Sequence, residues 1–146
     1  MNCALDSSVL VAALDDTAEF HPESEALLSL MNLSINAHAL AETFNTFTGG
    51  RLGFRIAPGI AASLLRHRIV PVVKSFSLSA DDLLKAMEEA ETRGVRGGAI
   101  YDYLHLAAAR IAGAARFYTH NTSHFLAFHR PGDPDIVHPR AFIPQS

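Results

Sequence analysis

The chain has 146 residues, of which 49% are hydrophobic and 18% charged. It therefore carries enough apolar material for one compact domain and is not a disordered chain. The formal net charge of −3 argues against a general nucleic-acid coat protein, but not against an enzyme that holds RNA on a local basic patch.

Strands are expected to alternate with helices along the first half of the chain. The first strand ends at Asp6, and Ser7 or Ser8 can cap the helix that follows. Pro22 is typical of a first helical turn, and a pair of glycines at 49–50 ends a later helix. In chain order we expect strand 2–5, helix 9–14, helix 22–31, strand 33–35, helix 37–48, helix 58–67 and strand 69–73.

The second half continues the same alternation. Ser79 can cap a helix over 80–91, and two glycines at 97–98 break the chain before a long helix from Ala99 to about Ala114. A strand at 116–119 and a short helix at 123–128 follow. The tail, with prolines at 131, 134, 139 and 144, is expected to be loop with one edge strand near 136–137.

The sequence also indicates how the chain is organised and where it works. We see no repeat, low-complexity tract or linker, so residues 1–146 are treated as a single domain. No apolar run approaches the ~20 residues needed to cross a bilayer, and the first residues lack a signal-peptide pattern. Cys3 is the single cysteine, which excludes an intrachain disulfide and a cysteine metal cluster. We expect a cytoplasmic protein with no membrane association.

Alternating strands and helices predict an α/β fold of three layers, in which helices cover both faces of a mainly parallel, Rossmann-like central sheet. Such sheets hold ligands at the carboxyl ends of their strands, where a topological switch opens a crevice. Polar residues directly after strands are therefore candidates for a functional site.

Two aspartates are the first candidates. Asp6 directly follows the first strand, although an aspartate there is also a common helix cap. Asp102 lies in a helix where His105 and Arg110 are the other strongly polar residues between 99 and 115. A helix without a polar face is buried, and a buried carboxylate is costly unless it is hydrogen-bonded, paired or bound to a metal. The apolar stripe expected on the other side of this helix comprises Ile100, Leu104, Ala107 and Ile111.

Glu42 and Asn121 complete the candidate set. Glu42 lies opposite a stripe of Leu40, Phe44 and Phe47, where an ordinary solvated glutamate would also lie. Asn121 follows the strand at 116–119. It is either a turn residue or a neutral side chain whose carbonyl oxygen can accept a hydrogen bond from a metal-bound water.

With these four positions in view, the chain resembles the PIN-domain nucleases, especially the toxins of VapBC-type toxin–antitoxin pairs. The matching segments are Leu5–Ser8, Ala41–Asn45, Ile100–Ala109 and Tyr118–Phe125. Each segment is short, but their order and placement span nearly the whole chain. The resemblance implies a PIN-like fold with acidic residues at the carboxyl edge of the sheet, and hydrolysis of RNA phosphodiester bonds with Mg²⁺ or Mn²⁺.

The chemistry of these residues agrees with that implication. Three carboxylates brought together repel one another unless a cation lies between them, and Mg²⁺ prefers oxygen ligands. We expect Asp6 and Asp102 to bind the metal directly, with Glu42 acting through water or as a further ligand. The family commonly has Asp where this chain has Asn121, so the number of metal ions, one or two, stays open.

Further roles follow for hydroxyl and basic residues. Candidates for hydrogen bonds that orient the acids are Ser7, Ser8 and Thr119. Candidates for RNA phosphate contacts, which on their own would be ordinary solvated arginines, are Arg93, Arg96 and Arg116. The resemblance also implies a homodimer and a small antitoxin protein as partner.

Three other functions fit parts of the sequence. His120 and His124 have the spacing of a zinc pair but straddle a strand–helix turn. A haloacid-dehalogenase-like phosphatase also begins with an Asp after its first strand, but needs a second Asp where Ser8 stands. A catalytically weak PIN-like binding module would instead act through dimerisation and through a groove for a partner helix formed by the apolar segment 49–65.

Overall fold

The structure is a computed structural model that describes residues 1–142, so Pro144 of the predicted tail loop lies outside the described residues. Within that range the fold is built on a five-stranded parallel sheet with the order β3-β2-β1-β4-β5. The strands are β1 (Cys3–Leu5), β2 (Leu33–Asn36), β3 (Lys74–Phe76), β4 (Arg116–Tyr118) and β5 (Asp135–Val137). This sheet confirms the predicted α/β fold class and the expected edge strand in the tail.

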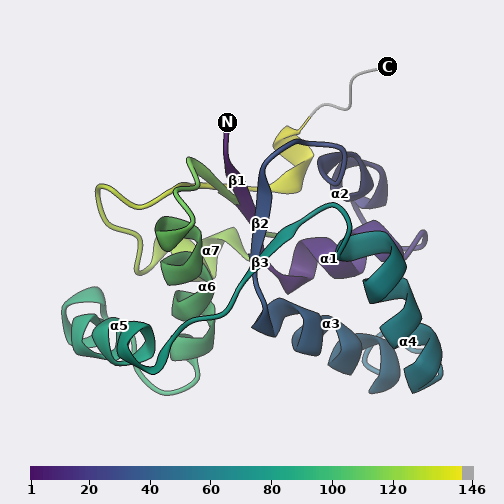
Figure 1. Cartoon of the computed structure of the whole chain (residues 1–146), viewed down its shortest axis with the longest axis horizontal. Helices are drawn as coiled ribbons and strands as arrows, with labels where there is room; N and C mark the ends of the chain where they lie inside the picture. The colour runs from purple at the N-terminus through teal and green to yellow at the C-terminus, as the bar shows by residue number, and fades with distance from the viewer. Residues whose placement is uncertain (143–146) are drawn as a thin grey trace.

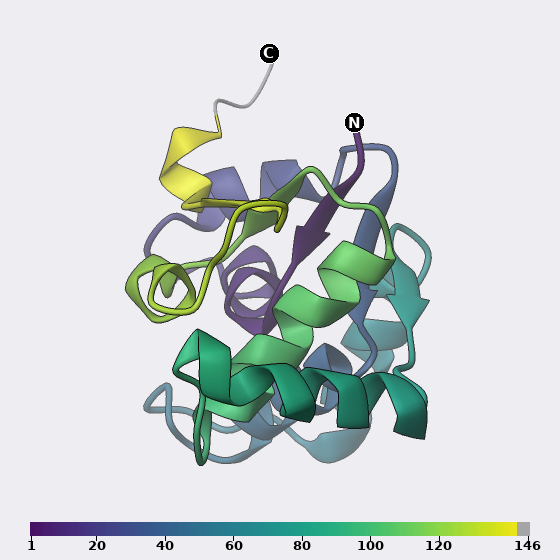
Figure 2. The same cartoon turned by 90° about the vertical axis from the view of Figure 1, so that its left-hand side faces the viewer.

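Helices cover both faces of the sheet, with α1–α4 to its right and α5–α7 to its left in Figure 1. The first layer contains α1 (Ser7–Leu14), α2 (His21–Leu27), α3 (His38–Thr48), α4 (Pro58–Leu64) and the π-helical turn η1 (Leu65–Ile69). The second layer contains α5 (Ala80–Arg93), α6 (Ala99–Ile111) and α7 (Thr122–Leu126), and Figure 2 shows α5 crossing in front of α6. A 3-10 turn, η2 (Pro139–Ala141), was not predicted. None of the helices in residues 1–142 is both long and apolar enough to span a bilayer.

Successive side chains of each strand point to opposite faces, and this gives the sheet two apolar cores. In β1, Cys3 and Leu5 are buried with residues of α1, α2 and α3, whereas Ala4 is buried with residues of α5, α6 and α7. In β4, Tyr118 belongs to the first core and Phe117 to the second. Both faces of the central strands are therefore covered, as a parallel sheet requires.

The strand order brings distant parts of the chain to one edge of the sheet. β1 lies between β2 and β4, so the residues that follow these three strands meet at their carboxyl ends. Asp6 follows β1, α3 begins at His38 after β2, and Thr119 follows β4. This edge is where the sequence predicts the site.

The predicted strand over 69–73 is wrong. Residues 65–69 form a π-helical turn, 70–72 form a further turn, and the strand β3 begins only at Lys74. Pro71 has no N–H to donate to a strand ladder, and Ile69 is fully buried in the first core. The apolar run therefore packs a connection against the first core, and the residues after it, Lys74–Phe76, form the edge strand.

Two helix boundaries also differ from prediction. The second helix ends at Leu27 and not at Met31, because the chain turns and Asn32 then adopts a left-handed conformation (φ 62°) that leads into β2. The first helix begins at Ser7 and is capped by Asp6, not by Ser7 or Ser8.

The long helix α6 is buried nearly all round, as expected from its lack of a polar face. The predicted stripe is wrong at Ile111, which is exposed, and the helix ends there and not near Ala114. The buried residues of α6 are Tyr103, His105, Leu106, Ala107, Ala108 and Ala109.

Candidate functional site

Asp6 directly follows β1 and caps α1. One carboxylate oxygen, Oδ1, accepts hydrogen bonds from the Ser8 backbone N–H (3.1 Å) and the Ser8 hydroxyl (2.5 Å). The other, Oδ2, accepts from the Thr119 hydroxyl at 2.6 Å. The Ser8 hydroxyl in turn accepts from the backbone N–H of His120 at 3.0 Å, which ties α1 to the segment after β4. Asp6 is only 4% exposed, so its position is fixed by these contacts.

Glu42 reaches the site from α3 and meets a histidine of α6. Its Oε1 accepts a hydrogen bond from Nε2 of His105 at 2.5 Å. His105 is 3% exposed, and its Nδ1 is buried without a hydrogen-bond partner among the residues that the structure describes. Burial would raise the pKa of Glu42, but His105, His38 and the Ser7 hydroxyl together lower it below the usual value.

Asp102 lies in the first turn of α6, with its side chain 37% exposed. Its Oδ2 is 3.8 Å from Nδ1 of His124, which α7 contributes. Burial and the charge of Glu42 raise the pKa of Asp102, and His105 and His124 act in the opposite direction. Asp102 and Glu42 are therefore close enough to interact electrostatically.

His105 is the group on which the three acids converge. Burial alone would lower its pKa, but the hydrogen bond that it donates to Glu42 and the negative charges of Glu42, Asp6 and Asp102 raise it above the usual value. Burial raises the pKa of Asp6 even though Ser8, Thr119 and His105 oppose that shift. The structure thus brings together carboxylates from positions 6, 42 and 102, around one buried imidazole.

The sequence suggests a divalent ion, which would need oxygen ligands from these side chains. Among residues 1–142, no three His, Cys, Asp or Glu side chains are already arranged around a single cation position. The oxygen donors nevertheless fit a hard ion, because carboxylates are its preferred ligands. Burial raises the pKa of both Asp6 and Asp102, and a cation bound between them would favour their ionised forms. Asp6, Asp102 and Glu42 are thus the residues that would hold such an ion.

His120 and His124 do not form the zinc pair that their spacing allowed. Nε2 of His120 is 3.1 Å from the Ser24 hydroxyl, whereas His124 faces Asp102. Burial and the charge of His138 lower the pKa of His120 to about 4. His120 is therefore a neutral, structural side chain at neutral pH.

A hollow of about 580 Å³ lies along α1, where the two serines that follow Asp6 line it. Ser7, Ser8 and Asn121 line it together with Arg51, an exposed residue in the loop between α3 and α4. Asn121 is exposed and makes no side-chain cap bond to α7, although its backbone N–H donates to the Thr119 hydroxyl at 3.0 Å. The amide of Asn121 and the guanidinium of Arg51 thus share one open surface next to the site.

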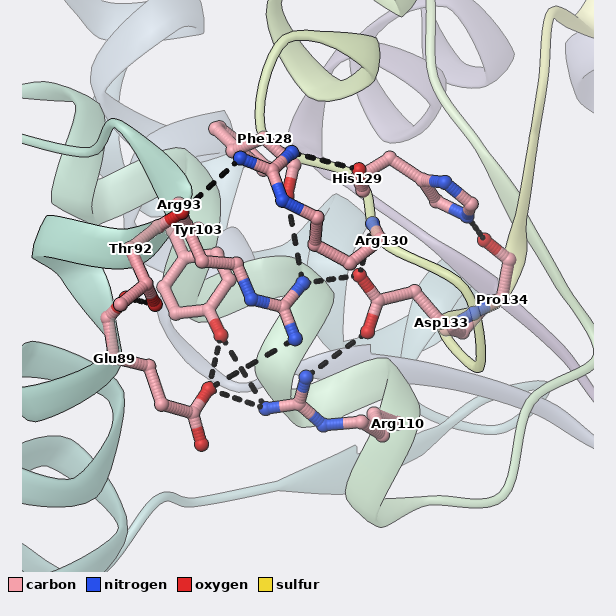
Figure 3. Close-up of polar contacts among 10 residues, drawn as sticks. All are labelled: Glu89, Thr92, Arg93, Tyr103, Arg110, Phe128, His129, Arg130, Asp133 and Pro134. Atoms are coloured by element: carbon pink, nitrogen blue, oxygen red, sulfur yellow. Dashed lines mark hydrogen bonds and ion pairs between the residues drawn. The ribbon is translucent and has the colours of Figure 1, made fainter.

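Two of the three arginines proposed for RNA contact lie elsewhere. Arg93 pairs with Asp133 and donates to the carbonyl of Phe128, inside the polar network shown in Figure 3. Arg116 is the first residue of β4, so it lies at the amino end of the sheet, away from the acids. The prediction that Arg93 and Arg116 lie near the rim of the site is therefore wrong. Arg96 is exposed just before α6 and remains a candidate.

Sequence reasoning missed His105 and Arg51. A weak signal existed for His105, because it was one of two other strongly polar residues on a helix with no polar face. No signal marked Arg51, since its place in the hollow beside Ser7 and Asn121 depends on how the loop after α3 folds back toward α1.

These features define an α/β protein with an acidic site at the carboxyl edge of a parallel sheet. The family model described as PIN domain matches residues 3–129, and the chain belongs to that family. It is 32% identical over 106 residues to ribonuclease VapC27 of Mycobacterium tuberculosis, a span that covers 73% of this chain and 75% of the relative. The chain is therefore also a homologue of the VapC ribonucleases.

Solved structures show the same fold. VapC20 of Mycobacterium tuberculosis, a sarcin-ricin loop cleaving toxin, matches with a TM-score of 0.68 at 21% identity, covering 91% of this chain and 100% of that one. A toxin–antitoxin complex from Klebsiella pneumoniae matches with a TM-score of 0.65 at 16% identity, covering 94% and 98%. At such identities the likeness establishes the fold alone. The activity has to be argued from the residues of the site.

Proposed function

We propose that this chain is a metal-dependent endoribonuclease and the toxin component of a toxin–antitoxin system. The observation that carries the proposal is the convergence of Asp6, Glu42 and Asp102 around His105 at the carboxyl edge of the sheet. Membership of the PIN-domain family and homology to VapC27 support it.

In this proposal Asp6 and Asp102 hold the metal ion, and Glu42 binds it directly or through water. When bound, Mg²⁺ or Mn²⁺ supplies Lewis-acid polarisation of the phosphate and lowers the pKa of the attacking water. The chain itself fixes the acids: Ser8 and Thr119 hold Asp6, and His105 keeps Glu42 ionised and in place. Asn121 lies at the rim, where its amide can accept a hydrogen bond from water.

Exposed arginines near the acids are proposed to hold the RNA backbone. Arg51 lines the hollow beside Asn121, and Arg96 precedes α6. Phosphate contacts of this kind are independent of sequence and weaken as salt concentration rises.

The test is cleavage of RNA by the purified protein as Mg²⁺ or Mn²⁺ is titrated. We expect internal cuts that appear with the metal, disappear with EDTA and return when metal is restored. Sequencing the new ends would then identify the RNA. No cleavage by the folded protein at any metal concentration would favour the alternative, a catalytically weak PIN-like binding module.

We propose an antitoxin protein and a second copy of the chain as partners. A related structure is a toxin–antitoxin complex, and the segment 49–65 leaves Phe54 and Ile60 exposed. Exposed apolar side chains grouped on one segment are typical of a protein interface. Light scattering of the purified protein would measure the oligomeric state.

Replacing His105 by Ala is expected to lower the cleavage rate at limiting Mg²⁺ by about 10- to 100-fold, the usual cost of losing a partner that orients a metal ligand. Glu42 would lose the donor that holds its carboxylate. His105→Gln, which keeps a hydrogen-bond donor, should retain more activity than His105→Ala. Rates measured across Mg²⁺ concentrations, with urea unfolding of each variant, check this. Equal rates for wild type and His105→Ala at every Mg²⁺ concentration would contradict it.

A further inference from the structure

An apolar cavity of about 310 Å³ lies between the carboxyl ends of β2 and β3 and the first turn of α6. Its apolar wall is formed by Leu78, Leu83 and Leu104, and its aromatic wall by His38 and Tyr101. Among residues 1–142, it shares no lining residue with the hollow beside Arg51. The proposed mechanism does not use this cavity.

The aromatic wall is directly linked to the acidic residues. His38 lies one helical turn before Glu42 on α3, and its charge contributes to the low pKa of Glu42. The rings of His38 and His105 have centroids 6.4 Å apart. Tyr101 immediately precedes Asp102 on α6. A molecule that enters the cavity would therefore lie beside the carboxylates.

Tyr101 presents an aromatic face that the fold does not use. It is 57% exposed, and its ring is nearly parallel to that of His38, at 22° with centroids 6.3 Å apart. Rings in full face contact are separated by about 3.5–4 Å, so a flat partner can still stack on this pair. Proteins hold the bases of single-stranded RNA mainly by stacking them on such side chains.

We propose that this cavity is the subsite for the nucleobase next to the scissile phosphate of single-stranded RNA. Tyr101 and His38 stack on the base, and Asn36 contacts its edge. The Oδ1 of Asn36 accepts the backbone N–H of His38 at 3.2 Å, which leaves the amide NH₂ as a donor to a base acceptor. The inference rests on the proposed nuclease function. The link to the acids favours the substrate over a protein side chain as the occupant.

Binding is measured first, with the Asp102→Asn protein and an oligoribonucleotide that carries 2-aminopurine, whose fluorescence falls when the base stacks. We expect quenching on binding. Adding Tyr101→Ala should weaken binding by about 5- to 150-fold and remove the quenching, whereas Tyr101→Phe should keep both. Ile111→Ala is the matched control, because Ile111 is similarly exposed at the far end of the same helix.

Cleavage by otherwise wild-type protein separates this inference from the function on which it rests. Tyr101→Ala should raise KM more than it lowers kcat, and should weaken any preference for the base beside the cut. If wild type cleaves RNA and Tyr101→Ala has the same KM and base preference, the subsite is overturned and the nuclease stands. If wild type does not cleave, the nuclease function fails. If Tyr101→Ala abolishes binding of a protein partner and leaves RNA kinetics unchanged, the cavity is a protein site and the proposal is wrong.

Discussion

Replacing Asp102 by Asn is expected to lower kcat/KM for RNA cleavage by about 10³-fold while the protein stays folded. A catalytic metal ion contributes several kcal/mol of transition-state stabilisation, and each ~1.4 kcal/mol is a factor of ten. Asn keeps the size of the side chain and removes the charge that the ion requires. Because burial raises the pKa of Asp102, the folded protein holds this proton more tightly than the unfolded chain does. At neutral pH the ionised carboxylate therefore costs stability, and the variant should melt at the same temperature as wild type or higher in the absence of metal.

Thermal unfolding with and without Mg²⁺ checks the same assignment independently of cleavage. An ion at 100 times its Kd stabilises the folded state by about 2.7 kcal/mol. The Tm of wild type should rise when Mg²⁺ is added, because the bound ion stabilises the folded state, and the Tm of Asp102→Asn should not rise. Asp81→Asn is the matched control, since Asp81 also lies in the first turn of a helix but is exposed and pairs with Lys85. A folded Asp102→Asn variant with wild-type kcat/KM would remove Asp102 from the site.

The parts of the fold that could be predicted are those with local causes. Asp6 was found because an acid directly after a buried strand faces the carboxyl edge of a parallel sheet. The cap at Ser79 predicts a helix over 80–91, and α5 forms over Ala80–Arg93 with Ser79 and Asp82 hydrogen-bonded to each other's backbone. Such signals depend on residues that are close together in the sequence. The strand order then brings the residues that follow the strands to one edge of the sheet.

The parts that could not be predicted depend on contacts between distant segments. The pairing of His105 with Glu42 joins residues 63 positions apart and exists only once α3 and α6 pack against the sheet. The sequence marks Arg93 as a candidate for RNA phosphate contact, yet in the fold it pairs with Asp133, 40 positions away. The run 69–73 has strong strand propensity, but burial of Ile69 in the core decides its conformation.

The ionic network around Asp133 joins α5, α6 and the loop before β5 (Figure 3). The side chain of Asp133 is only 2% exposed. It accepts hydrogen bonds from Arg93, from Nη1 of Arg110 at 2.9 Å and from the backbone N–H of Arg130 at 2.9 Å. Glu89 of α5 forms ion pairs with Arg93 and with Arg110. Removing the central acid would leave a mostly buried Arg93 without its main partner.

Replacing Asp133 by Asn is therefore expected to lower the free energy of unfolding by about 3–5 kcal/mol at pH 7, the range for removing one partner of a buried ion pair. The pKa of Asp133 is depressed, because the arginines and the Arg130 N–H outweigh the effect of burial. A depressed pKa contributes stability above the unfolded value near 3.8, and this contribution is lost as the pH falls through the folded value. Urea unfolding at pH 7 and pH 3 should thus show a large difference from wild type that shrinks in acid. Asp135→Asn, an exposed acid two residues on, should change stability little at either pH. If the free energy of unfolding of Asp133→Asn at pH 7 lies within about 1 kcal/mol of the wild-type value, the network does not stabilise the fold.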